Sequence, residues 1–352
     1  MERGEKTEIV LEYLRNGIAS GKWTHALLPK EMDLAKQFGV ARGTVRRAFD
    51  HLVSEGLVSR KKHYGTVLNE QTLKSHCICS VIRASGHFYG DVFDSLQKKI
   101  TRNGYRMQHI DVYGYDKPKM RKHILRGVNH LLSLPNADKF ILDGYIFNDY
   151  PRYSDILKKK PVFFDFFDNI PPDNVTGVLI DYEEAGKIGA KYLLQAGCRH
   201  PLLILGDNPA VKKRYTPECF AKHKVKQFIN GYSEVLKQNG LDPMLYIYYS
   251  TLDKKSILDQ LYEIFSTPSC RPDGIFADSD TFMVRILRIA TECGYTPEHL
   301  VGCYDTPWSR GDGGFTFPSI RIPAEVCAEE LLNQVMLPPH LRKNIFIKPE
   351  TL

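Results

Sequence analysis

The sequence predicts an α/β protein with a small helical head followed by two larger lobes built on parallel sheets. Its 352 residues exceed one ordinary domain of about 150 residues. Apolar side chains recur at helical spacing near the start, whereas apolar strand-like runs alternate with helical patterns over the remainder. A hydrophobic content of 43% and a charged content of 25% are those of globular chains. Fibrous and disordered classes are therefore excluded.

Composition also limits the compartment and the chemistry. No stretch approaches the ~18 consecutive apolar residues of a membrane span, and the first ten residues lack the apolar core of a secretory signal. We therefore expect a cytoplasmic protein with no membrane partner. The eight cysteines are scattered apart from Cys77 and Cys79, and the twelve histidines show no metal spacing. Buried, reduced thiols are expected, with no metal and no cofactor.

The first 68 residues are expected to form one domain that begins with two helices. Val10, Leu14 and Ile18 recur every four residues, which is one face of a helix. Pro29 suits the start of a second helix, and Gly39 suits its end. A helix pair with this spacing requires a third element to bury its apolar side chains.

A third helix and a hairpin complete this domain. The helix is expected over 42–55, and its predicted buried side chains are Val45, Ala48, Phe49, Leu52 and Val53. Its start is expected to present outward Arg42, Gly43, Thr44, Arg46 and Arg47. Two strand-like runs, 57–61 and 66–69, flank the turn at 63–65. Three helices and a hairpin describe a winged helix-turn-helix, whose third helix enters the major groove of DNA.

Positive charge is concentrated where such a domain would touch DNA. Residues 42–62 carry a net charge of +4, although the whole chain of 352 residues carries only +7. The basic residues lie at one helix start and along one hairpin, which suits contacts with phosphates. A solvated amphipathic helix is the simpler alternative.

The motifs Leu28-Pro29-Lys30-Glu31 and Phe38-Gly39-Val40-Ala41-Arg42-Gly43-Thr44-Val45-Arg46 resemble the GntR family of DNA-binding domains. The resemblance covers nearly all of 5–68. It implies operator contacts from Arg42, Thr44, Arg46 and Gly65. Further candidates for contact with DNA, from their place at the helix starts and the turn, are Lys30, Gly43, Arg47 and His63, and an exposed turn histidine with no role is the alternative at His63. Three residues depart from the family pattern: Met32 replaces an arginine, Ala41 a capping serine and Gly43 a threonine. These departures leave the operator sequence open.

After a polar linker at 69–75, residues 76–352 are expected to form a second region. Continuous apolar strands between helices indicate parallel strands buried on both faces, and ligands of such folds bind beyond the carboxyl ends of the strands. The motifs Asp143-Gly144-Tyr145-Ile146, Pro272-Asp273-Gly274-Ile275-Phe276-Ala277-Asp278-Ser279-Asp280 and Val301-Gly302-Cys303-Tyr304-Asp305 resemble LacI/GalR-type effector domains. The resemblance implies a periplasmic-binding-protein-like sensor with two lobes, 76–166 with 319–340 and 167–318 with 341–352.

The same resemblance nominates a ligand site between the lobes. Asp305 stands where the family binds sugar hydroxyls, Ser279 replaces a usual asparagine, and Phe228 replaces a common sugar-binding arginine. Further candidates at strand ends are Arg83, Ser85, Phe88, Tyr89, Asp143 and Asp165. Core packing of the aromatic residues and simple turn capping by the two first-lobe aspartates remain alternatives. The Phe228 departure leaves the identity of the sugar open.

These features predict a transcription regulator that acts as a homodimer. It is expected to bind double-stranded operator DNA and a small effector, which is expected to be a sugar. By resemblance the expected sign is repression relieved by ligand. Two alternatives use the same two-lobe fold. A solute-binding protein would need a signal peptide and no head, and a sugar-acting enzyme would need a catalytic constellation, which the sequence does not show. A basic run at Lys212-Lys213-Arg214 is expected to be a solvated loop.

Overall fold

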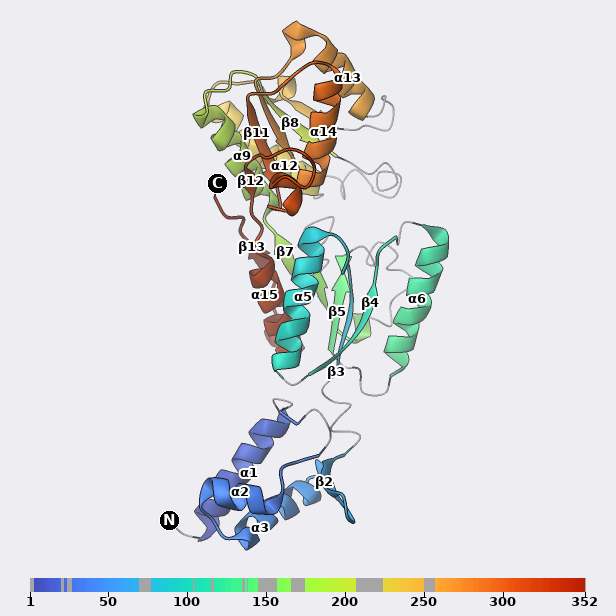
Figure 1. Ribbon diagram of the computed structural model, residues 1–352, viewed down its shortest axis with the longest axis vertical. Helices are drawn as coiled ribbons and strands as arrows, with labels where there is room; N and C mark the ends of the chain where they lie inside the picture. Colours follow the sequence, from blue (N-terminus) through green and yellow to red (C-terminus); the bar gives the residue numbers. More distant parts are fainter. Residues whose placement is uncertain are drawn as a thin grey trace.

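The computed structural model describes residues 3–19, 22–23, 27–69, 77–103, 105–114, 117–134, 137, 139–144, 157–165, 175–206, 224–249 and 257–351. Figure 1 shows three bodies in succession: a helical head, a first lobe and a second lobe. The expected linker at 69–75 and the basic run at 212–214 lie outside the described residues, apart from residue 69. Among the described residues, no helix is long and apolar enough to cross a membrane.

The head consists of three helices and one antiparallel hairpin, as the sequence predicts. Its elements are α1 (Arg3–Ala19), α2 (Glu31–Phe38), α3 (Arg42–Ser54), β1 (Val58–Lys61) and β2 (Gly65–Leu68). Leu14, Leu34, Val45 and Phe49 are fully buried where the helices meet. Lys61 pairs with Gly65 at the end of the hairpin, which leaves three residues for the turn. A compact core thus fixes α3 against the hairpin.

Two residues of α3 differ from the expected pattern. Thr44, expected to face outward, is buried, with 5% of its surface exposed, whereas Val53, expected in the core, is 40% exposed. The buried positions Thr44, Val45, Ala48, Phe49 and Leu52 follow a helical stripe, and Thr44 lies on this stripe one turn before Ala48. The predicted face was therefore shifted toward the end of the helix.

The first lobe is a six-stranded parallel sheet. Its elements are β3 (Cys77–Ile82), α5 (His87–Arg102), β4 (Arg106–Asp111), α6 (Pro118–Ser133), β5 (Lys139–Asp143), β6 (Val162–Phe164), β7 (Thr176–Ile180), α15 (Ala324–Met336), η5 (Pro339–Leu341) and β13 (Ile345–Ile347). The strand order is β13-β7-β6-β5-β3-β4. The order reverses between β3 and β5, which is the point at which doubly wound sheets bind ligands.

The second lobe repeats this plan with five strands. Its elements are α9 (Tyr182–Gln195), β8 (Pro201–Leu205), α12 (Lys224–Gln238), η2 (Pro243–Leu245), β9 (Ile247–Tyr249), α13 (Ile257–Ser266), η3 (Pro268–Cys270), β10 (Gly274–Ala277), α14 (Asp280–Glu292), β11 (His299–Cys303), η4 (Pro307–Ser309) and β12 (Ser319–Ile320). The order β12-β11-β10-β8-β9 reverses between β8 and β10, and every printed pair is parallel. Two similar lobes are therefore confirmed.

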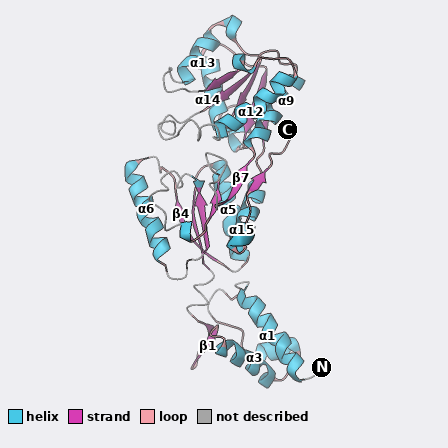
Figure 2. Ribbon diagram, turned by 180° about the vertical axis from the view of Figure 1, so that it is seen from behind, coloured by secondary structure: helices cyan, strands magenta, loops and turns pink. Residues whose placement is uncertain are grey.

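Helices cover both faces of each sheet. In the first lobe, α5 and α15 lie on one side of the sheet and α6 lies on the other (Figure 2). Alternate strand residues serve the two faces: in β8, Leu203 joins the core beneath α9 and α12, whereas Leu202 and Ile204 join the core beneath α13 and α14. Burial on both faces explains why the sequence of β8 is apolar throughout.

The lobe boundaries differ from the expected ones at three segments. Thr176–Ile180 and Ile345–Ile347 lie in the first sheet, where Ile345 is opposite Val178, although both were assigned to the second lobe. Ser319–Ile320 lies in the second sheet beside β11, although it was assigned to the first lobe. The chain thus crosses to the second lobe after Ile180 and returns after Ile320. These are the last residues of β7 and β12, and each is still paired within its own sheet.

Two glycines let α9 and α12 pack almost backbone to backbone. A Cβ atom on Gly231 would lie 1.9 Å from the Glu183 carbonyl oxygen, and one on Gly186 would lie 2.4 Å from the Phe228 carbonyl oxygen. Any larger residue would force the helices apart. Phe228 and Tyr232 are fully buried in the resulting layer.

Candidate functional site

The first candidate surface is the start of α3. Arg42, Arg46 and Arg47 are exposed there, as is Gly43. Within the described part of the chain, Arg46 and Arg47 form no ion pair, so their guanidinium groups are available for phosphates or bases. Thr44 is buried, and its backbone amide donates to the Ala41 carbonyl oxygen at 2.9 Å. The structure therefore gives Thr44 a place in the helix packing instead of the expected outward position.

Acidic residues hold two arginines of the same surface. The Glu31 carboxylate accepts from Arg42 Nε at 2.8 Å and lies 3.9 Å from the Arg60 guanidinium. Arg60, on the hairpin, also pairs with Asp50 of α3 at 2.7 Å and donates to the Arg46 carbonyl oxygen at 3.3 Å. Arg60 thus ties the wing to α3, and carboxylates engage two of the six basic side chains in 42–62.

The wing tip projects basic and aromatic side chains. His63 has a φ of +63° and Gly65 a φ of +107°, so the turn contains two left-handed residues. Lys61, Lys62 and His63 are exposed, and Tyr64 is 71% exposed. Lys30 is exposed beside the start of α2. The predicted head residues other than Thr44 therefore lie on the surface of the domain.

The second candidate site begins at the reversal point of the first sheet. Arg83 follows β3, and its Nε donates to Asp143 at the end of β5 at 2.7 Å. Its other nitrogen Nη2 donates to Asp165, which follows β6, at 3.0 Å. Both carboxylates are buried, so the paired guanidinium offsets part of the cost of their desolvation. Three predicted ligand residues are thereby brought together.

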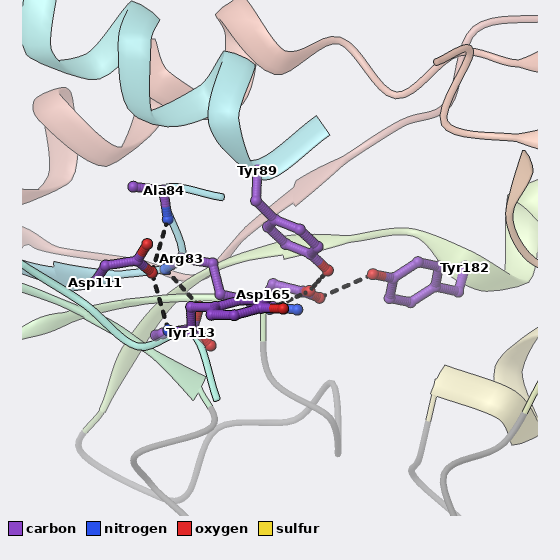
Figure 3. A network of polar contacts seen from close by, with 8 residues as sticks. Arg83, Ala84, Tyr89, Asp111, Tyr113, Asp165 and Tyr182 are labelled. Carbon is purple, nitrogen blue, oxygen red and sulfur yellow. Dashed lines mark hydrogen bonds and ion pairs between the residues drawn. The ribbon is translucent and has the colours of Figure 1, made fainter. Parts of the chain in front are cut away.

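Two tyrosines reach the same carboxylate from different sides (Figure 3). Tyr89 donates to Asp165 Oδ2 at 2.5 Å, and its ring lies against the Arg83 guanidinium at 3.5 Å. Tyr182, the first residue of α9, donates to Asp165 Oδ1 at 2.9 Å. The Tyr182 hydroxyl also lies 3.1 Å from that of Tyr304, which follows β11. We call Arg83, Tyr89, Asp165, Tyr182 and Tyr304 the inter-lobe cluster.

Burial governs the protonation of these hydroxyls. It raises the pKa of Tyr89, Tyr182 and Tyr304 well above the ordinary tyrosine value, and the charge of Asp165 raises the pKa of each further. All three hydroxyls therefore keep their protons in the neutral range. Each has one proton to donate.

The second lobe contributes a strained loop after β11. Tyr304 and Asp305 have φ values of +89° and +47°, which non-glycine residues rarely adopt. The Asp305 amide donates to Ser319 Oγ at 2.9 Å, and Ser319 in turn donates to Asp280 Oδ1 at 2.5 Å. The buried Asp280 also accepts from the amide and hydroxyl of Thr306 at 2.6 and 2.9 Å. These bonds hold the loop in its conformation.

The Asp305 side chain remains partly open to solvent. Its Oδ1 lies 3.3 Å from Arg310 Nε, and 35% of the side chain is exposed. Among the described residues, only the surface guanidinium of Arg310 pairs with this carboxylate, so a ligand hydroxyl can take the place of the guanidinium at modest cost. The structure thus leaves Asp305 suited to the expected role in ligand binding.

The remaining four predicted residues occupy four different settings. Phe88 is buried and packs on Tyr304, with ring centroids 5.0 Å apart, so it helps join the lobes. Phe228 is fully buried behind Tyr182, at 5.2 Å, and belongs to the core. Ser85 Oγ is buried with no hydrogen-bond partner among the described residues, which is a costly state that a ligand could relieve. Ser279 precedes α14 without capping it.

Four residues of this region escaped the sequence analysis: Tyr182, Tyr304, Asp280 and Ser319. Tyrosines beside apolar strands resemble core residues, and Asp280 resembles a helix-start residue. One usable signal was position, because Tyr182 and Tyr304 each follow the carboxyl end of a strand. Among the described residues, no group of three or more histidine, cysteine or acidic side chains is arranged to hold a metal ion.

Comparison with known proteins gives independent information. Residues 6–68 match the family described as bacterial regulatory proteins, gntR family. The arabinose metabolism transcriptional repressor of Halalkalibacterium halodurans is 24% identical over 308 residues, which cover 82% of this chain and 76% of that protein. The relatives named as regulators agree with the expectation that this chain is not an enzyme.

Two solved structures share the fold of most of this chain. The complex of the transcriptional regulator CelR with cellobiose is 17% identical, covers 92% of this chain and 98% of its own, and has a TM-score of 0.57. A dimeric Lac repressor is 12% identical, covers 78% of this chain and 96% of its own, and has a TM-score of 0.56. Residues 6–68 are therefore a domain of the gntR family of bacterial regulatory proteins, joined to a two-lobe region with the LacI/GalR-type fold.

Proposed function

We propose that this chain is a sequence-specific transcription regulator, in the expected case a repressor, whose affinity for operator DNA is set by a sugar. The observation that carries the proposal is the union of two sites in one chain. Exposed arginines lie at the start of α3, and a buried polar cluster lies where the strand ends of the two lobes meet. A DNA-binding head and a two-lobe sensor in one chain act together only if ligand binding at the sensor changes the affinity of the head for DNA.

The same reasoning supports a homodimer in the cytoplasm. A winged helix binds one half-site, and pseudopalindromic operators require two heads at a fixed spacing. Isologous pairing of the sensor regions would supply that spacing. Operator DNA also places the working protein in the cytoplasm.

Arabinose and cellobiose are the first probes for the effector. One sequence relative is named for arabinose metabolism, and one solved structure of similar fold is a complex with cellobiose. A ligand that prefers one arrangement of the lobes shifts the population toward it, and operator affinity changes by the same coupling factor. We expect the effect to be release of DNA.

The proposal is tested with a duplex that the full-length protein selects from a random pool. Fluorescence anisotropy then measures operator affinity with and without L-arabinose, cellobiose and a panel of further sugars. A sugar that changes the affinity severalfold supports the proposal. A protein that selects no duplex contradicts the DNA-binding role, and one whose duplex binding ignores every sugar in the panel contradicts the sugar effector.

The alternative of a solute-binding protein is disfavoured by the head, which has no role in transport. A sugar-acting enzyme is disfavoured by the state of the buried carboxylates. Asp165 already accepts from Arg83, Tyr89 and Tyr182, so it is poorly placed to take a proton from a substrate.

A further inference from the structure

The hydroxyls of the inter-lobe cluster have a determined direction. Asp165 is paired with the Arg83 guanidinium at 3.0 Å, so its carboxylate accepts hydrogen bonds and cannot donate one. The hydroxyl of Tyr182 donates its single hydrogen bond to this carboxylate, because a charge-assisted hydrogen bond is stronger than a neutral one. The Tyr182 oxygen can then only accept, so the proton of the contact with Tyr304 at 3.1 Å comes from Tyr304. The chain of donation runs from Tyr304 through Tyr182 to Asp165.

This chain of hydrogen bonds joins the two lobes. Tyr304 follows β11 of the second sheet, and Tyr182 begins α9, which packs on the same sheet. Asp165 and Arg83 follow strands of the first sheet. Two ring contacts accompany the polar link, Phe88 with Tyr304 at 5.0 Å and His87 with Trp308 at 6.1 Å. The hydroxyl of Tyr182 thus links Asp165 of the first lobe to Tyr304 of the second.

The direction of the chain decides what the cluster offers a ligand. The Tyr304 hydroxyl donates its hydrogen bond to Tyr182, and the Tyr89 hydroxyl donates its hydrogen bond to Asp165. Both hydroxyl oxygens keep lone pairs and no free proton. The partly exposed Asp305 carboxylate is likewise an acceptor. Ser85 Oγ, which is buried without a partner among the described residues, can donate or accept.

We infer that the effector site selects ligands by the hydrogen bonds they donate, with Tyr182 and Tyr304 as the residues that set this preference, and that it takes a neutral or amino sugar in preference to a sugar acid or sugar phosphate. This inference rests on the proposed effector site. A carboxylate or phosphate would bring acceptors against acceptors. It would also meet Asp143, Asp165 and Asp305, whereas Arg83 is already engaged by two of them. Lys224 has its Nζ 5.8 Å from the ring centre of Tyr182, and it is a group through which a phosphate would bind if the inference fails.

The ligand test uses full-length protein and matched sugars. Three series are compared by thermal shift and calorimetry: L-arabinose with L-arabinonate, cellobiose with cellobionate, and D-glucose with D-glucosamine and D-glucose 6-phosphate. In each series that binds, we expect the anionic member to bind at least tenfold more weakly than its neutral or amino partner. An acid or phosphate that binds as tightly overturns the inference. If no member of any series binds, the sugar effector of the proposed function is overturned instead.

A second test needs no ligand. Tyr182→Phe, Tyr304→Phe and the double variant form a double-mutant cycle, and Tyr192→Phe on the same helix is the control. Loss of the buried hydroxyl of Tyr182 should lower Tm by about 2–4 °C, and Tyr304→Phe should lower it only when Tyr182 is present. Additive effects of the two substitutions, or a control as destabilising as Tyr182→Phe, would refute the directed chain.

Discussion

At the scale of single residues, Arg46 and Arg47 differ from Arg42 and Arg60. The first two are exposed and have no ion-pair partner among the described residues, whereas Glu31 and Asp50 hold the other two. Glu31 competes with operator DNA for Arg42, whereas no carboxylate among the described residues engages Arg46. Arg46 is therefore the better test of the head.

Arg46→Ala should weaken operator binding at least tenfold. The loss of one phosphate contact should also reduce the slope of log affinity against log salt by about 0.9. The measurement is an anisotropy titration between low and moderate salt, with Arg102→Ala in the sensor region as control. An unchanged affinity and slope would remove Arg46 from the DNA surface.

Asp305→Ala should abolish the response to sugar and leave operator binding intact. The Asp305 carboxylate is partly exposed and loosely held by Arg310, so its loss costs the fold little. Operator affinity measured with and without the effective sugar decides the matter. A variant that still responds fully would place the sugar elsewhere.

His109 gives a pH dependence that can be derived from its surroundings. Burial lowers its pKa below the ordinary value of 6.5, and its Nε2 has no partner among the described residues. Nδ1 lies 3.3 Å from Ser80 Oγ, and the ring packs on Phe93 at 4.2 Å. The unfolded chain therefore binds a proton that the folded chain resists. Stability is fully present above about pH 6.5 and is lost as the pH falls below it.

His109→Phe should make the free energy of unfolding less sensitive to acid. The check is urea unfolding at pH 7.5 and pH 5.5 for both proteins, with exposed His130→Phe as control. A drop in stability between the two pH values that is the same in His109→Phe as in the parent would show that another group is responsible.

At the scale of elements, the alternation of strands and helices was predictable because apolar runs and helical stripes are local patterns. The order of strands in a sheet was not, since parallel neighbours are far apart in the chain. Ile345–Ile347 pairs with Thr176–Ile180, and no local pattern in either segment predicts that the two strands are neighbours. The helix at Ala324–Met336 was missed, although Cys327, Ala328, Leu331, Leu332 and Val335 form its buried stripe.

The candidate site was predictable in its position and only partly in its members. Arg83, Asp143 and Asp165 follow strands, and parallel strands end at one edge, so their meeting could be expected. Tyr182 and Tyr304 could not be separated from core aromatics without knowing their hydroxyl partners. Phe228 shows the reverse case. It occupies the position of a sugar-binding arginine in the family, but its side chain is buried in the core.

The contact between α9 and α12 yields a prediction about stability. Gly231→Ala should lower Tm strongly, because the new Cβ would lie 1.9 Å from the Glu183 carbonyl oxygen, a backbone atom that cannot turn away. Gly43→Ala is the matched control: Gly43 lies in α3 with nothing within 4 Å of the added atom. It should raise stability by about 0.5–1 kcal/mol. Calorimetry that ranks the two variants the other way would show that α9 and α12 can separate without cost.

At the scale of the whole molecule, the proposed function requires that the heads of two chains be held by their sensor regions. Sedimentation of the full-length chain should therefore show a dimer at micromolar concentration, and residues 76–352 alone should also dimerise. A monomeric profile for the sensor fragment, with a dimeric full-length chain, would assign dimerisation to the heads.

The insertion of the second lobe within the first has a consequence for biosynthesis. The second lobe is one continuous insert, from Tyr182 to Ile320, whereas the first lobe is divided between the stretches before and after it. While the ribosome is still translating the insert, β7 has β6 on one side and no neighbour on the other, because its partner β13 ends only at Ile347. An unpaired strand edge invites association between nascent chains. The nascent chain should thus be exposed to misassembly until β13 has been translated, and a stop codon ahead of Ile345 should leave a folded second lobe on an incomplete first one.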